Sequence, residues 1–109
     1  MKLACLSVLG MLLVGGCARQ DGPATVKLHP SVLAQAQKQY AELCAACHGI
    51  HARGSVGPDL TVSRFKYGKN RVAIEKSILS GRPGGMPAFG SNLKPEDATT
   101  LADYLLTLE

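Results

Sequence analysis

The chain has 109 residues, 46% of them hydrophobic, and a formal net charge of +4. This length allows one small domain. The moderate charge and the absence of long basic runs argue against a nucleic-acid partner. The sequence has no Trp, two Phe and three Tyr, so a small domain has few large side chains with which to build a core.

The first 16 residues have the layout of an export signal. Lys2 is followed by an apolar run and then by small residues, which is typical of a secretory signal peptide. The apolar run, about 12 residues, is shorter than the roughly 20 that a membrane-spanning helix needs. We therefore predict export, with an uncleaved anchor or a buried helix as the alternative.

The end of this signal, "LVGGC", resembles a bacterial lipobox. The resemblance implies that Cys17 becomes a lipidated N-terminus, which places the protein on the periplasmic side of a membrane. Val14 and Gly15 depart from the commonest lipobox residues. "GCA" also fits ordinary cleavage, which would leave a soluble periplasmic protein. Residues 17–30 contain Gly and Pro and are predicted to form a linker, with one folded domain over residues 31–109.

The first helix of that domain is predicted to begin at Ser31, a good N-cap just after Pro30. It continues as far as Gly49, a typical helix stop. Residues on its expected inner face recur at helical spacing: Ala36, Tyr40, Leu43 and Cys47.

Two further helices follow a Gly-rich loop, and residues 62–68 are ambiguous between a short helix and a loop. Asn70 is predicted to cap a helix over residues 71–80 that ends at Gly81. Pro95 at a first helical position opens the last helix. The expected inner faces carry Ile74 and Ile78 in one helix, and Leu101, Tyr104, Leu105 and Leu108 in the other. No segment alternates like a strand, so the predicted fold is all-α.

The motif C-x-x-C-H at the end of the first helix carries the chemistry. Cys44, Cys47 and His48 share one face of a helix, so two thiols can add to the vinyl groups of a haem while the imidazole reaches its iron. A structural zinc site requires four ligands, and His29 and His51 do not complete a familiar spacing with the two cysteines. A thioredoxin-like redox dithiol occurs near a βαβ unit, and the sequence shows no such unit. We therefore favour covalent haem.

Met86 is the candidate for the second axial ligand, because the other two methionines, Met1 and Met11, lie in the signal. Gly85 lets the backbone approach a haem closely, and Pro87 stiffens the loop. The alternative is an ordinary core methionine. His/Met ligation fills both axial positions of a haem, which suits one-electron transfer.

The strings "CAACHG", "GPDL", "GGMPAFG" and "LKPEDATTLADYLLTL", in this order, resemble a monohaem class I cytochrome c, here of bacterial lipoprotein type. The resemblance covers residues 31–109. It implies about four helices with Gly/Pro-rich loops around one covalently bound haem c. Cys44 and Cys47 would be the thioether links, and His48 and Met86 the axial ligands. Pro58 would offer its carbonyl to the Nδ1–H of His48.

The resemblance also implies that the first and last helices cross, with Tyr40 near Leu101 and Tyr104. Two positions depart from the family pattern. Ala36 stands where Gly is common, which bears on how closely the helices cross. Lys94 stands where Ser or Thr usually caps the last helix, and the weaker cap is expected to cost at most about 1 kcal/mol.

We therefore expect a monomeric electron carrier, not an enzyme, that works with redox partner proteins. The alternative is a non-catalytic haem subunit of a dehydrogenase or reductase complex; an open-iron sensor or enzyme is less favoured. A group of basic residues is either a solvated loop or a docking patch for an acidic partner: Arg64, Lys66, Lys69 and Arg71.

Overall fold

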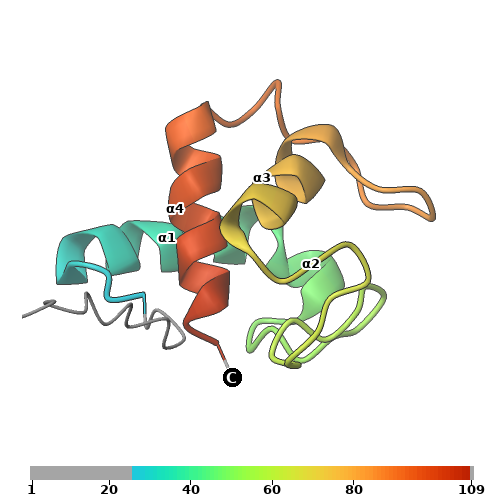
Figure 1. Cartoon of the computed structure of the whole chain (residues 1–109), viewed down its shortest axis with the longest axis horizontal. Helices are drawn as coiled ribbons and strands as arrows, with labels where there is room; N and C mark the ends of the chain where they lie inside the picture. Colours follow the sequence, from blue (N-terminus) through green and yellow to red (C-terminus); the bar gives the residue numbers. More distant parts are fainter. Residues whose placement is uncertain (1–25, 109) are drawn as a thin grey trace, which may run out of the picture.

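A computed structural model describes residues 26–108 (Figure 1). The predicted signal, Cys17 and most of the predicted linker lie outside the described residues. The helices are α1 (Pro30–Leu43), α2 (Ala45–His48), α3 (Arg71–Ser80) and α4 (Pro95–Leu106). Within residues 26–108 there is no strand, and the all-α prediction is confirmed. None of these helices has both the length and the hydropathy to cross a membrane.

The start of α1 differs from the prediction that Ser31 is the N-cap. Pro30 is already helical, and His29 is the cap. The Nδ1 of His29 lies 2.8 Å from the Ser31 hydroxyl and accepts the Ser31 N–H at 3.4 Å. The helix starts earlier because the fixed φ of proline suits the first helical position, where no N–H bond is needed.

The predicted long first helix is divided at Cys44. Its backbone turns there, with φ −114° and ψ −34°. The N–H of Cys47 bonds the Cys44 carbonyl at 3.2 Å, and the N–H of His48 bonds the same carbonyl at 2.9 Å. As predicted, Gly49 ends the segment, with φ +82°. The predicted inner face is correct for Tyr40, which is buried, and wrong for Cys47, which is exposed.

The ends of α3 agree with the prediction. The side chain of Asn70 accepts the Ala73 N–H at 2.9 Å, and Gly81 ends the helix with φ +69°. At α4 the Lys94 side chain has no oxygen to serve as a cap; instead the Lys94 N–H donates to Asp97 Oδ2 at 3.2 Å. Residues 62–68, ambiguous in the sequence, form no helix.

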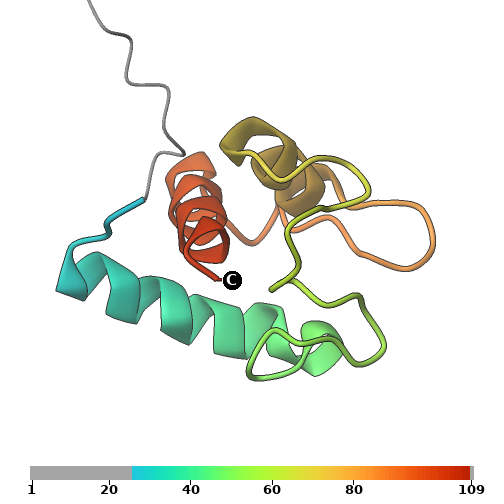
Figure 2. The same cartoon turned by 60° about the horizontal axis from the view of Figure 1, so that its bottom comes forward.

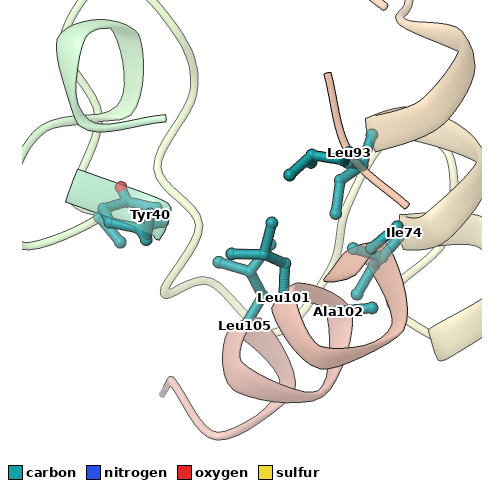
Figure 3. Close-up of a cluster of buried hydrophobic side chains, with 9 residues drawn as sticks. Tyr40, Ile74, Leu93, Leu101, Ala102 and Leu105 are labelled. Carbon is teal, nitrogen blue, oxygen red and sulfur yellow. The ribbon is translucent and has the colours of Figure 1, made fainter. Parts of the chain in front are cut away.

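The core forms where α4 packs against both α1 and α3, as Figures 1 and 2 show. Figure 3 shows Leu101 and Leu105 between Tyr40 on one side and Ile74 and Leu93 on the other. All five side chains are buried. Burying this apolar surface is the main favourable contribution to folding.

The predicted crossing of the first and last helices is confirmed. The rings of Tyr40 and Tyr104 meet edge to face, with centroids 5.8 Å apart, a favoured geometry for aromatic pairs. Ala36, which stands where the family often has glycine, is completely buried.

Candidate functional site

The bend between α1 and α2 places the two cysteines in different surroundings. Cys44 is half-buried against the core, whereas Cys47 is exposed. Burial raises the pKa of the Cys44 thiol to about 11, and the neighbouring Cys47 adds to this. Neither cysteine forms a disulfide within residues 26–108, which fits the covalent attachment that the motif predicts.

The imidazole of His48 is held by the loop that follows α2. Its Nδ1 lies 2.8 Å from the carbonyl oxygen of Pro58, the contact expected from the sequence. A carbonyl only accepts, so Nδ1 carries the hydrogen and the neutral ring keeps its lone pair on Nε2. Such a bond to the second ring nitrogen fixes the orientation of a metal-binding histidine.

Gly57 packs directly against this ring, a contact that the sequence reading missed. A Cβ on Gly57 would lie 3.0 Å from both Cε1 and Nδ1 of His48. The Gly57 N–H also donates to the Cys47 carbonyl at 2.7 Å. The loop therefore uses the absence of a side chain to approach the imidazole closely. The only sequence signal for this contact is a glycine next to Pro58.

Met86 lies in the loop that connects α3 to α4. In Figures 1 and 2 this orange loop and the green α2 lie on the side of the domain away from the start of α1. Met86 is half-buried, and its carbonyl accepts the Arg82 N–H at 3.1 Å. A Cβ on Gly81 would lie 2.6 Å from that carbonyl oxygen, so glycine is needed at the start of the loop.

A cavity of about 390 Å³ lies elsewhere, between the loop after α2 and the end of α4. Its lining contains none of the predicted site residues: Ile50, His51, Arg53, Thr61, Tyr104, Thr107 and Leu108. Within residues 26–108, no three His, Cys, Asp or Glu side chains gather as a metal site. His29, which the sequence left as a spare imidazole, caps α1 instead.

The predicted basic group divides into two pairs. Lys69 Nζ donates to the carbonyls of Val62 at 2.8 Å and Leu108 at 3.2 Å. Arg71 forms a two-bond ion pair with Asp103, at 2.6 and 3.0 Å. These two cations therefore connect parts of the fold. The other two, Arg64 and Lys66, are exposed and form no ion pair with a carboxylate of residues 26–108. The four cations therefore differ in what they contact, and the docking role stays a prediction.

Four helices with a C-x-x-C-H segment at the end of the first helical stretch define a c-type cytochrome. Residues 31–105 match the family model described as cytochrome c oxidase, cbb3-type, subunit III, and the chain belongs to this family.

The similar proteins are c-type cytochromes or contain such a domain. The cbb3-type cytochrome c oxidase subunit CcoP of Rubrivivax gelatinosus is 38% identical over 81 residues, which are 72% of this chain and 27% of that protein. Cytochrome c55X of Pseudomonas aeruginosa is 36% identical over 87 residues, 77% of this chain and 72% of that protein. The crystal structure of cytochrome cL from Hyphomicrobium denitrificans is 30% identical with a TM-score of 0.62, covering 68% of this chain and 45% of that one.

The family membership settles the general class of function. The chain carries a cytochrome c domain of the class I type, the kind of domain that transfers electrons with a covalently bound haem c. The donors present fit that cofactor, since two free thiols and an imidazole with an open Nε2 stand together at α2. The chain spans about a quarter of the length of the oxidase subunits it matches.

Proposed function

We propose that Cys44 and Cys47 attach one haem c, and that His48 and Met86 bind its iron from opposite sides. Each thiol would add across one vinyl group, its hydrogen going to the vinyl carbon, so no oxidant is consumed. The single observation that carries this proposal is the 2.8 Å contact between His48 Nδ1 and the Pro58 carbonyl. It leaves Nε2 as the nitrogen that can reach a metal.

Met86 completes the coordination in this proposal. A thioether opposite an imidazole raises the reduction potential of a haem and leaves no open position for a substrate. The half-buried position of Met86 and the glycines around its loop support this assignment. A haem there would supply one-electron redox chemistry, and this chain's cysteines, His48 and Met86 would hold it in place.

The proposed location is the periplasmic side of a bacterial membrane. The signal layout of residues 1–16 and the lipobox-like end at Cys17 support export and lipid anchoring. Residues 17–30 would then link the anchor to the domain over residues 31–109. Mass spectrometry of the intact protein from the membrane fraction would test this, since a lipid on Cys17 adds a defined mass that a Cys17→Ala variant lacks.

Two kinds of partnership fit an electron-transfer domain of this family. The first, which we favour, is a monomeric carrier that meets its redox partners transiently. The second is a fixed haem subunit of a larger complex, an alternative that the match to oxidase subunits supports. Co-purification from gently solubilised membranes separates them: a stoichiometric large subunit supports the second, and its absence supports the first.

The optical spectrum of the purified, haem-loaded protein tests the axial ligands. We expect the oxidised protein to have a weak sulfur-to-iron charge-transfer band in the near-infrared, lost in Met86→Ala and retained in Ser91→Ala, a control at an exposed position in the same loop. A wild-type protein without the band, or one that binds CO rapidly when reduced, would favour the open-iron reading instead.

A further inference from the structure

Arg82, the second residue after α3, makes contacts in three directions. Its Nε donates to Ser77 Oγ at 2.8 Å. Its guanidinium carbon lies 4.2 Å from the centroid of the Tyr67 ring. Its backbone N–H donates to the Met86 carbonyl at 3.1 Å. One residue thus joins α3, the loop before α3 and the loop that carries Met86.

The contacts of the Arg82 side chain restrict its position. Arg82 is half-buried, and a hydrogen bond from a charged donor is stronger than one between neutral groups. Its acceptor, Ser77 Oγ, donates in turn to the Ala73 carbonyl at 3.0 Å, so the hydroxyl is fixed to α3. A planar guanidinium stacked on an aromatic ring gains further attraction and cannot be replaced by an ammonium without loss.

The rest of the loop shows why this anchor matters. On the return side, Phe89 N–H bonds the Ile78 carbonyl at 2.9 Å and Gly90 N–H bonds the Leu79 carbonyl at 3.1 Å. At the tip, a Cβ on Gly84 or Gly85 would meet no atom within 4 Å. The tip is therefore unpacked, and Met86 follows it directly. On the leading side, the Arg82 side chain attaches the loop to α3.

We propose that Arg82 is a positioning residue that clamps the Met86 loop to α3 and Tyr67, and so keeps the Met86 sulfur on the haem iron. The inference rests on the proposed axial ligation by Met86. Arg82 itself touches neither iron nor sulfur in this proposal; it acts through the backbone that presents the sulfur.

The test compares variants of the haem-loaded protein. Arg82→Gln removes the charge, and Arg82→Lys keeps it without the planar group. Ser77→Ala removes only the acceptor, and remains informative if Arg82→Gln fails to fold. Lys66→Gln is the control, since Lys66 lies over the same ring at 5.4 Å but is exposed. The readouts are the near-infrared band during heating, helical circular dichroism, and the rate of CO binding to the reduced protein.

We expect Arg82→Gln to lose the near-infrared band well below the temperature at which helicity is lost, and to bind CO about tenfold faster than wild type. In Arg82→Lys and Ser77→Ala, the temperature of band loss should fall and the rate of CO binding should rise by smaller amounts. Both quantities should be unchanged in Lys66→Gln. Band loss that coincides with helix loss in every variant, or unchanged CO binding, overturns the inference. A wild-type protein without the band overturns the ligation proposal itself, and this inference with it.

Discussion

The hydroxyl of Tyr40, in α1, donates a hydrogen bond of 2.7 Å to the carbonyl of Gly49, at the end of α2. Tyr40 is almost fully buried, and its bond fixes the helix end next to His48. The Gly49 carbonyl also accepts the Ala52 N–H at 3.0 Å. The hydroxyl therefore supplements an existing bond at the point where the core meets the haem-binding segment.

Tyr40→Phe is expected to lower the free energy of unfolding by about 1 kcal/mol, because it removes one buried hydrogen bond but leaves the Gly49 carbonyl a second partner. Urea unfolding of the haem-loaded protein measures the change. Tyr67→Phe, at an exposed tyrosine, is the control and should change stability little. A loss above about 3 kcal/mol would mean that the ring has repacked.

Stability is expected to fall in alkaline solution, with Tyr40 as one cause. Burial is the main cause that raises the pKa of Tyr40 to about 12, with smaller contributions from Cys44 while its thiol is free and from Tyr104. In the unfolded chain this hydroxyl has the ordinary pKa of about 10. The stabilisation from keeping Tyr40 protonated in the folded state is therefore complete below about pH 10 and is lost as the pH rises toward 12. The advantage of wild type over Tyr40→Phe should shrink by about 1 kcal/mol by pH 11. A constant difference from pH 8 to pH 11 would contradict this assignment.

Gly57→Ala is expected to destabilise the haem-loaded protein by about 1–3 kcal/mol, the usual range for an overpacked site. The added Cβ would lie 3.0 Å from two atoms of the His48 ring and 3.2 Å from the Cys47 carbonyl. Ser55→Ala, at an exposed position in the same loop, should stay within about 0.5 kcal/mol of wild type. Equal unfolding free energies for the two variants would show that the ring can move aside without cost.

Local signals made much of this fold predictable from the sequence. Asn70 and Gly81 mark the two ends of α3, because a helix cap and a helix stop act within one turn of the helix. The apolar stripes placed Tyr40 and Tyr104 each on an inner face, and the resemblance to class I cytochromes c implied that the two meet. The C-x-x-C-H string at Cys44 is likewise contiguous, so its meaning does not depend on knowing the fold.

Other features depended on contacts between distant residues. Lys69 looks like a surface cation, yet its ammonium group bonds a carbonyl 39 residues further on, at Leu108. Arg82 looks like one more loop cation until Ser77 and Tyr67 are seen around it. Ala52 adopts φ +58° while only 1% exposed, a conformation that non-glycine residues rarely take. Side-chain periodicity carries no information about such pairings.

The division of the basic group yields a prediction about electron transfer. Arg64 and Lys66 are exposed, whereas Asp103 offsets the charge of Arg71. Neutralising Arg64 and Lys66 together should therefore slow oxidation by an anionic oxidant, ferricyanide, by about threefold at low ionic strength. The effect should nearly vanish above about 0.15 M salt, where the screening length is about 8 Å. Arg71→Gln should change the rate less.

Stopped-flow oxidation of the reduced, haem-loaded protein measures these rates. A cationic oxidant, tris(phenanthroline)cobalt(III), should not be slowed by the Arg64→Gln/Lys66→Gln variant, because the removed charges repel it. Lys27→Gln/Lys38→Gln removes the same net charge from exposed positions at and before α1, and should have the smaller effect on ferricyanide. Equal slowing by both double variants would mean that net charge alone sets the rate. Arg64 and Lys66 would then have no local part in guiding an acidic partner to the haem.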